Sequence, residues 1–243
     1  GGLLRLIGKW LNVGVIDGKD LFYPEAGTPQ GGVISPILAN IFLHHVLDEW
    51  YVKQIKPLLK GRSFLIRFAD DFIFGFEYES DARRVMEALG KRFARYDLTI
   101  HPEKTALIDF RNPSKRKETS EIKKDTFDFL GFTHYWGKSR RGYYVIKRKT
   151  IGKRLRQRMK LIWNWCKENL HVKITEQVKT LRSKLYGHYQ YYGIRGNYKM
   201  LEVYYEYLLY AWRRWLGRRT RNGYINQEKF DRILATFKLP KPR

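Results

Sequence analysis

Cysteine is almost absent from this chain of 243 residues, which contains only Cys166. A single cysteine excludes an internal disulfide and fits a reducing compartment. Cys166 lies in the aromatic segment Trp163-Asn164-Trp165-Cys166. This setting favours a buried packing residue over a nucleophile or a metal ligand.

Long apolar runs are missing as well. No stretch reaches the length of about 18 apolar residues that indicates a membrane-spanning helix. No segment repeats, which argues against a helical solenoid. The chain is still long enough to bury a sizeable core, in one large domain or in two small ones.

Acidic residues are scarce in the second half of the chain. Of the 48 Lys and Arg residues, 14 lie in residues 1–110, and 14 of the 24 Asp and Glu residues lie there too. The remaining 34 basic and 10 acidic residues carry the whole net charge of +24. Such asymmetry predicts a polyanionic partner. A solvated basic face or a membrane surface is the alternative, but the many Tyr and Trp residues among the Arg residues favour nucleic acid.

The first third of the chain predicts short elements joined by a glycine-rich loop. Residues 3–13 have helical spacing, and residues 15–23 read as two short strands around an Asp-Gly turn. A Gly- and Pro-rich loop over 24–32 precedes a helix over 35–51. Ser35 is the expected N-cap of that helix, and Pro36 is its expected first residue.

Two neighbouring carboxylates interrupt the apolar stretch Phe64–Phe76. The runs on either side are rich in Phe and Ile and are as long as typical strands. We therefore expect a β-hairpin with Ala69, Asp70 and Asp71 at or near its tip. Adjacent carboxylates in an apolar setting repel each other, and Mg²⁺ is the natural cation to offset this. The alternative is an ordinary polar turn.

The rest of the chain predicts a mixed part followed by helices. A helix capped by Ser80 or Asp81 precedes two short strands near 98–100 and 106–108, with a polar loop over 111–125 and further strands over 127–132 and 143–146. From residue 147 onward, three or four antiparallel helices with basic outer faces are expected, beginning near Thr175, Asn197 and Asn226 in the later cases. Most of their aromatic rings should lie inside.

Four segments resemble, in the same order, successive motifs of reverse transcriptases. Their sequences are most similar to those of the proteins encoded by group II introns. The segments are Pro29–Pro36, the Asp70-Asp71 hairpin, Leu98–Thr105 and Phe129-Leu130-Gly131-Phe132. The segments Leu185–Tyr189, Gly193–Asn197 and Trp212–Trp215 are similar to the maturase, or X, domain of the same family. The resemblance covers nearly the whole chain.

The resemblance implies an α+β fold: a partial polymerase palm, with an antiparallel sheet and helices, followed by an all-α thumb and maturase bundle. Residues 1–147 would form the palm, without the fingers and the first catalytic Asp motif, and residues 148–243 the thumb and X domain. The chain is thus expected to be the C-terminal portion of a longer enzyme. Clustered Cys and His residues of an endonuclease module are absent.

The resemblance also implies roles in a two-metal Mg²⁺ site. Asp70 would hold both metals, and Asp71 would be an auxiliary carboxylate. Lys104, otherwise a solvated loop lysine, would lie near the triphosphate. Asp17 and Asp20 lie too close to Gln30, in turn-like context, to supply the partner carboxylate. That Asp is expected outside this chain, so the chain alone should be inactive.

Nucleic-acid contacts are implied at three further places. Pro29, Gln30 and Gly31 would contact the incoming nucleotide and the templating base. Residues Phe129, Leu130, Gly131 and Phe132 would form the primer grip. The RNA-binding candidates are the arginines of the last helices: Arg195, Arg213, Arg214, Arg218, Arg219 and Arg221.

The function expected from these features is an RNA-directed DNA polymerase of a group II intron that also assists intron splicing as a maturase. The alternatives are a reverse transcriptase of a defence-associated system and, for this chain alone, a non-catalytic splicing factor that binds intron RNA. The implied partners are intron RNA, a primer-template, deoxynucleotides and the N-terminal segment of the same enzyme, with a homodimer left open and no membrane. The implied location is the bacterial cytoplasm or nucleoid, or an organelle.

Overall fold

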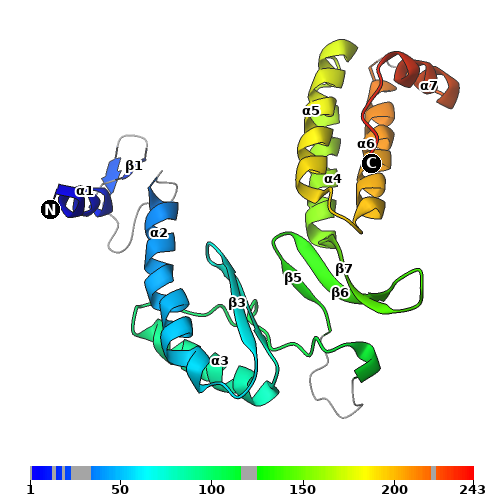
Figure 1. The fold of residues 1–243 in the computed structure, drawn as a ribbon. Coiled ribbons are helices and arrows are strands. Elements are labelled where there is room, and N and C mark those ends of the chain that lie inside the picture. Colours follow the sequence, from blue (N-terminus) through cyan, green and yellow to red (C-terminus); the bar gives the residue numbers. More distant parts are fainter. Residues whose placement is uncertain (1, 13–14, 18–19, 23–33, 116–124, 220–222) are drawn as a thin grey trace. The chain divides into compact units, whose positions relative to one another are not determined.

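The computed structural model describes residues 2–12, 15–17, 20–22, 34–115, 125–219 and 223–243, and it shows helices with small antiparallel sheets (Figure 1). This mixture confirms the predicted α+β class. The chain divides into two compact units, Gly1–Leu107 and Ile108–Arg243. The division into functional domains after residue 147 stays a prediction.

The first unit contains the predicted elements up to α3. Helix α1 (Gly2–Leu11) precedes the antiparallel strands β1 (Val15–Asp17) and β2 (Asp20–Phe22). Helix α2 (Ser35–Leu43) continues as π-helical turns over His44–Glu49 and Tyr51–Ile55 and ends in a 3₁₀ turn, Lys56–Leu58. Strands β3 (Ser63–Phe68) and β4 (Asp71–Phe76) then form a hairpin before helix α3 (Glu79–Ala94).

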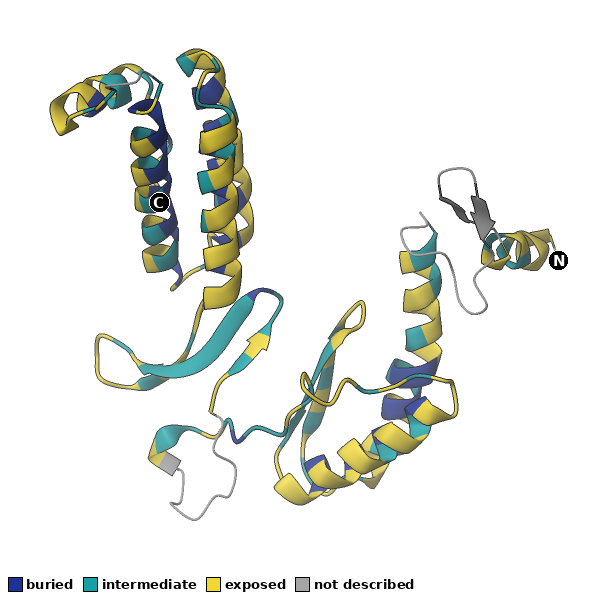
Figure 2. Ribbon diagram, turned by 180° about the vertical axis from the view of Figure 1, so that it is seen from behind, coloured by how far each residue is buried: buried dark blue, intermediate teal, exposed yellow. Residues whose placement is uncertain are grey.

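The core of the first unit covers one face of the β3–β4 hairpin. Its buried residues come from the π-helical turns and from α3, and the hairpin contributes Leu65, Phe72 and Phe74. Period-2 alternation places Phe64, Ile66 and Phe68 on the opposite face. Phe64 is 54% exposed, Ile66 52% and Phe68 64%. Figure 2 colours the residues of the hairpin by their burial. The hairpin thus has one covered face and one bare apolar face.

Three predicted details of this unit are wrong. The N-cap of α2 is Ile34 rather than Ser35, so the helix begins at Ser35 and not at Pro36. No strand forms over 98–100 or 106–108. Leu98 and Ile100 pack on the core, and the Leu98 N–H donates to the Phe93 carbonyl at 3.0 Å rather than to a neighbouring strand. Neither Ser80 nor Asp81 caps α3, whose N-cap is Tyr78. The Asp81 carboxylate is buried and instead accepts hydrogen bonds from the backbone N–H groups of Lys60 and Gly61, at 3.0 and 3.1 Å. It therefore fixes the loop that leads into β3.

The second unit begins with a three-stranded antiparallel sheet and continues with helices. The strands β5 (Phe127–Phe129), β6 (Phe132–Lys138) and β7 (Tyr144–Thr150) lie in the order β5-β6-β7. The helices are α4 (Gly152–Glu168), α5 (Ile174–Tyr192), α6 (Tyr198–Leu216) and α7 (Gln227–Thr236). Helix α5 begins one residue before Thr175, whereas Asn226 is the N-cap of α7 as predicted, accepting from the Lys229 N–H at 2.9 Å.

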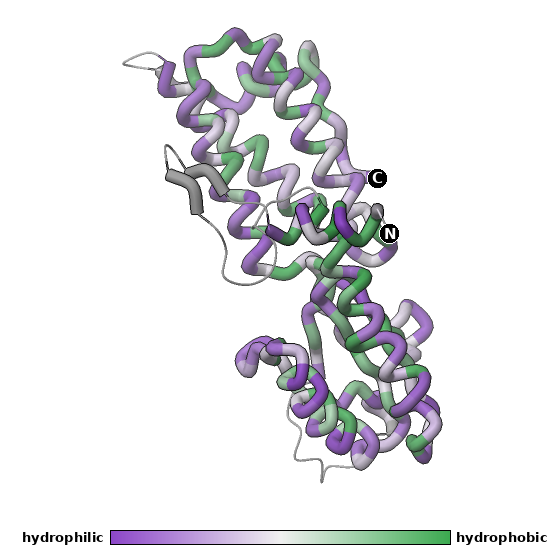
Figure 3. Tube along the Cα trace, turned by 90° about the vertical axis from the view of Figure 1, so that its left-hand side faces the viewer, coloured by the Kyte–Doolittle hydropathy of each residue, from purple (hydrophilic) through white to green (hydrophobic). Residues whose placement is uncertain are grey.

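Apolar stripes of α4, α5 and α6 meet in the core of this unit, with contributions from α7 and from Leu239. Figure 3 shows hydrophilic and hydrophobic residues interleaved along these helices, as amphipathic helices require. Trp212 is fully buried, and its indole N–H donates to the Gln177 side chain at 2.7 Å. Cys166 is buried as predicted, and burial raises the pKa of its thiol to about 12. Burial and the raised pKa both disfavour the reactive thiolate form.

Candidate functional site

Asp70 and Asp71 lie at the tip of the β3–β4 hairpin, as the sequence predicts. Phe68 pairs with Asp71, so Ala69 and Asp70 form a two-residue turn. Ala69 has a φ of +54°, which lies in the left-handed region that residues other than glycine rarely adopt. Both carboxylates are exposed, and among the described residues neither forms an ion pair with a Lys or Arg side chain.

Arg67, two residues before the turn residue Ala69, makes a network that the sequence did not reveal. Its guanidinium makes a bidentate pair with Asp48, with N–O distances of 2.9 and 2.6 Å. It also donates to the Asn40 side chain at 2.8 Å and to the Ala69 carbonyl at 3.0 Å. The hydrogen bond from Arg67 lowers the pKa of Asp48, and the same bond raises the pKa of Arg67. The network is therefore ionic at neutral pH.

The two hairpin carboxylates suit a hard divalent cation. Mg²⁺ prefers one or two carboxylates together with water and phosphate oxygens, and exposed aspartates leave room for both. Across the parts of the chain that the structure describes, no group of three or more His, Cys, Asp or Glu side chains could hold a metal ion. Asp70 and Asp71 are thus two neighbouring carboxylates without a third such ligand among the described residues.

The other predicted residues of the first unit are less informative. Lys104 is exposed in a turn where its N–H donates to the His101 carbonyl at 3.2 Å. No hydrogen bond or ion pair between described residues joins Lys104 to Asp70 or Asp71. Pro29, Gln30 and Gly31 lie outside the described residues.

The predicted primer grip forms a tight turn between β5 and β6. Phe129 pairs with Phe132, which leaves Leu130 and Gly131 as the two turn residues. Both have positive φ, +46° and +85° respectively. A side chain at Gly131 would also lie 3.2 Å from the Arg154 guanidinium and 3.3 Å from the Tyr191 ring. Backbone conformation therefore favours glycine here, and a side chain would also require Arg154 and Tyr191 to shift by a few tenths of an ångström.

Helix α5 and the start of α6 support this turn. The Tyr191 hydroxyl donates to the Leu130 carbonyl at 3.1 Å, and its ring stacks on Phe132 with centroids 6.2 Å apart. Behind the turn, the buried Asn197 side chain accepts from the Thr150 N–H at 2.8 Å and donates to the Thr150 hydroxyl and the Tyr192 carbonyl. The sheet and the helices are thus tied together through side chains.

The arginines predicted to bind RNA fall into two groups. Arg195, Arg214 and Arg218 are exposed, and Arg218 lies over the Trp215 ring at 4.9 Å. Arg213 and Arg219 are half-buried and hold neighbouring backbone, because Arg213 donates to the Ile225 carbonyl at 3.0 Å and Arg219 to the Val172 carbonyl at 2.5 Å. Burial lowers the pKa of Arg219. Arg221 lies outside the described residues.

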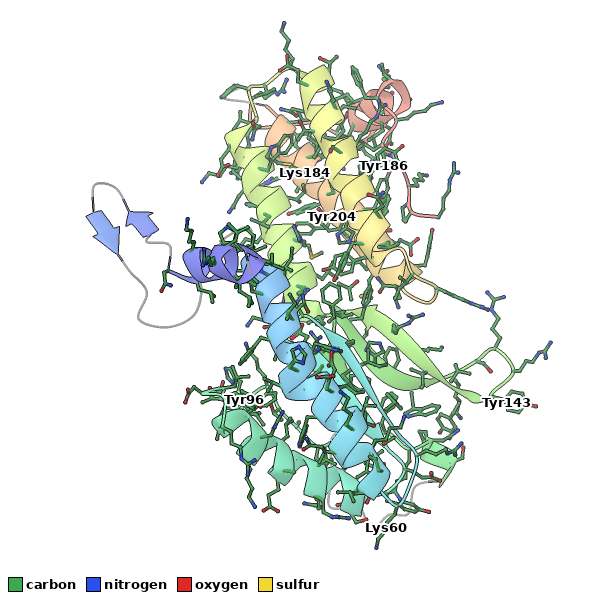
Figure 4. All side chains as sticks on the ribbon, turned by 60° about the vertical axis from the view of Figure 1, so that its left-hand side comes forward. Lys60, Tyr96, Tyr143, Lys184, Tyr186 and Tyr204 are labelled. Atoms are coloured by element: carbon green, nitrogen blue, oxygen red, sulfur yellow. The ribbon has the colours of Figure 1, made fainter. Side chains whose placement is uncertain are left out.

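The prediction of basic outer faces on these helices did not single out the individual cations of α4 and α5. Helix α4 exposes a row of basic side chains, the α4 basic face, consisting of Lys153, Arg154, Arg156, Arg158, Lys160 and Lys167. A groove of about 710 Å³ along α5 is lined by Lys179 and Arg182 beside the exposed Tyr186. Figure 4 labels Tyr186 and, on the same helix, Lys184. The signal in the sequence was the spacing of these cations, which a count of the overall charge does not show.

Comparison with known proteins places this geometry in a family. The profile of the family described as "Reverse transcriptase (RNA-dependent DNA polymerase)" matches residues 3–134, which include the Asp70-Asp71 hairpin and end within β6. The chain belongs to the reverse transcriptase family. The resemblance that the sequence motifs predicted is therefore confirmed at the level of the family.

Individual relatives of this reverse transcriptase chain are intron-encoded. It is 29% identical to the group II intron-encoded protein LtrA of Lactococcus lactis subsp. cremoris over 131 residues, 54% of this chain and 20% of the relative. It is 47% identical over 53 residues to an uncharacterized 91 kDa protein in the cob intron of Schizosaccharomyces pombe, 22% of this chain and 6% of that protein. It is 40% identical over 62 residues to the putative COX1/OXI3 intron 1 protein of Saccharomyces cerevisiae, 25% of this chain and 7% of that protein.

These matches confirm the predicted resemblance to group II intron reverse transcriptases and maturases. The matched regions span a fifth or less of each relative's length. None of the described helices is long and apolar enough to cross a membrane.

Proposed function

We propose that this chain is part of a group II intron RNA-directed DNA polymerase that also assists intron splicing as a maturase. The observation that carries the proposal is the pair Asp70-Asp71, exposed at the tip of a hairpin within the region that matches the reverse transcriptase family. Among the described residues neither carboxylate is paired with a Lys or Arg side chain, so both can ligate a cation. Nucleotidyl transfer requires such a cation, Mg²⁺, beside the triphosphate.

In this proposal Asp70 and Asp71 hold Mg²⁺, which would neutralise charge on the triphosphate and activate the primer 3′-oxygen. Asp70 is the main ligand and Asp71 the auxiliary one. A further Asp from another part of the enzyme completes the site. Lys104 binds the triphosphate, and Pro29, Gln30 and Gly31 contact the nucleotide and the template base. The exposed position of Lys104 is compatible with that task.

The bare apolar face of the hairpin supports the view that residues 1–147 are a partial palm. Phe64, Ile66 and Phe68 are each more than half exposed. Contiguous apolar side chains left exposed in this way often mark a surface that a partner covers. We propose that the N-terminal segment of the same enzyme, including the fingers and the remaining palm strands, covers this face.

The second unit supplies the nucleic-acid contacts in this proposal. The turn Phe129–Phe132 holds the primer 3′ end, next to the exposed Arg154 and Tyr191. Residues 148–243 form the thumb and X domain, and the α4 basic face binds phosphates with Arg195, Arg214 and Arg218. Arg213 and Arg219 keep the backbone around them in place and contribute less to RNA binding.

A second candidate function concerns this chain alone. The excess of basic residues after residue 110 favours RNA binding without polymerisation, as a splicing factor that stabilises intron RNA. A reverse transcriptase of a defence-associated system is the remaining alternative. Intron RNA structure flanking the gene, as opposed to a defence locus, would distinguish the two kinds of reverse transcriptase.

The test is Asp70→Ala in a protein that carries these residues and the rest of the polymerase. DNA synthesis on a primer-template should be abolished, because the loss of one ligand weakens both metal positions. RNA binding should remain near normal. Asp71→Ala should be less severe. Near-normal primer extension by the Asp70→Ala protein would contradict the proposed function.

A further inference from the structure

Arg67 is a charged residue inside an apolar strand, and the proposed chemistry gives it no task. A charge in such a place requires a partner, and Arg67 has three: Asp48, Asn40 and the carbonyl of Ala69. We propose that Arg67, held by Asp48 and Asn40, is a positioning residue that fixes the backbone at Asp70 for metal binding. The inference rests on the proposed function of Asp70.

The contact with Ala69 carries the argument. The Ala69 carbonyl carbon is bonded to the Asp70 nitrogen, so the hydrogen bond of 3.0 Å from Arg67 fixes the peptide plane from which Asp70 projects. Ala69 has a φ of +54°. Alanine in this region costs about 1 kcal/mol or more, so the conformation persists only where surrounding contacts hold it. Arg67 provides such a contact.

Asp48, which holds the Arg67 guanidinium on the side away from the turn, lies in a well-packed part of the unit. Asp48 lies in the π-helical turn His44–Glu49, directly after Val46 and Leu47, which are 1% and 0% exposed. The bidentate pair leaves only 13% of the Arg67 side chain and 26% of the Asp48 side chain exposed. A planar guanidinium that is bonded on both sides cannot turn without breaking several bonds. The buried core of the unit thereby sets the position of the turn.

A purely structural ion pair is the competing explanation. Such a pair would join the hairpin to the helix and need not bond the turn itself. The fourth hydrogen bond of Arg67, to the carbonyl before Asp70, is the feature that a structural pair does not require. Lysine at position 67 would keep the charge but could not make the fork and the two further bonds together. This difference allows an experimental separation.

The experiment compares Arg67→Lys and Asp48→Asn with matched changes at the other end of the same hairpin. There Arg62 and Glu77 form an exposed pair at 3.3 Å, so Arg62→Lys and Glu77→Gln repeat the chemistry without touching the turn. Each variant is made in the protein that carries these residues and the rest of the polymerase. Primer extension is measured as a function of Mg²⁺ concentration, and thermal unfolding is measured on the same samples.

We expect Arg67→Lys and Asp48→Asn to lower kcat and to raise the Mg²⁺ concentration for half-maximal rate, each by about tenfold, as residues behind metal ligands do. Excess Mg²⁺ should restore part of the rate. The double variant should be no worse than the poorer single one, because both act through one network. The Arg62 and Glu77 variants should match the parent protein.

An unchanged Mg²⁺ midpoint in folded Arg67→Lys and Asp48→Asn proteins would overturn the inference, even if their unfolding temperatures fall. If these variants fail to fold, Asn40→Ala decides, because Asn40 is an exposed helix residue whose side chain makes only two hydrogen bonds to described residues, one from Arg67 and one to the Pro36 carbonyl. It should shift the Mg²⁺ midpoint in the same direction by less, and an unshifted midpoint would again overturn the inference. Asp70→Ala is measured in parallel. If it keeps activity, the proposed function fails rather than the role of Arg67.

Discussion

His188 is a buried histidine that stays neutral in the folded protein. It lies between Tyr192 and Tyr204, with its ring centroid 3.9 Å from that of Tyr204. Burial, with a smaller contribution from the positive charge of Arg158, lowers the pKa of His188 to about 4. The unfolded chain therefore binds a proton here below about pH 6.5, whereas the folded chain does so only near pH 4.

We therefore expect the free energy of unfolding of residues 108–243 to fall as the pH drops from about 6.5 towards 4, by up to about 3 kcal/mol from this group. His134 adds to the same trend, because burial lowers its pKa as well. Urea unfolding at several pH values measures the slope. His188→Phe should flatten it, whereas the same change at the exposed His171 should not. An equal slope in the His188→Phe protein would contradict this account.

At the scale of elements, one side chain joins the sheet of the second unit to its helices. Asn197→Ala would remove three hydrogen bonds and leave the Thr150 N–H and the Tyr192 carbonyl buried without this partner. We expect a loss of about 2–4 kcal/mol in the free energy of unfolding. Asn226→Ala is the control, because that N-cap makes one exposed bond and should cost about 1 kcal/mol. Equal losses in urea unfolding would show that Asn197 is an ordinary cap.

Most elements could be predicted from the sequence because their patterns are local. The apolar periods of α3 and α6 and the two runs of the β3–β4 hairpin indicated their type and place. Caps were harder to predict. Asn197 does stand at the start of α6, but its side chain bonds to Thr150 rather than to its own helix. Asp81 likewise serves the loop at Lys60 and Gly61. Such partners lie 20 or more residues away, and no local pattern reveals them.

The features of the candidate site also differ in whether a local sequence pattern reveals them. The motif around Asp70 and the turn at Gly131 could be found from residue types alone. The contacts of Arg67 with Asp48 and Asn40 could not, because they depend on how a helix lies across the hairpin. The only signal was an arginine between Ile66 and Phe68 in an otherwise apolar strand.

At the scale of the whole molecule, the uneven charge predicts how RNA binding depends on salt. Residues 108–243 should bind structured RNA with an affinity that falls steeply with salt, by about 0.7 to 0.9 logarithmic units per phosphate contact for each tenfold rise. Arg154→Gln and Arg158→Gln on the α4 basic face should each reduce the slope. Arg232→Gln is the control, because Arg232 is paired with Glu228 in α7. A binding constant that does not change between low and moderate salt would contradict the prediction.

The 243-residue chain alone should show no polymerase activity with Mg²⁺, a primer-template and nucleotides. In the proposed function Asp70 needs a further Asp from another part of the enzyme, because Mg²⁺ dehydrates too reluctantly to bind firmly to one or two aspartates. The bare hairpin face should also promote aggregation. Adding the N-terminal portion of the enzyme in trans should restore some primer extension. Robust synthesis by the chain alone would show that another carboxylate, such as Asp17 or Asp20, completes the site.

The hydrogen bond between Thr150 and Asn197 should form late in folding. It joins residues 47 positions apart, and the chain between them contains all of α4 and α5. Closing so long a loop costs entropy that is repaid only after both helices have formed and paired. The bond should therefore form after the main barrier to folding. Its loss would leave the folding rate nearly unchanged and would make the unit open faster, so Asn197 controls how long the assembled turn and helices stay together.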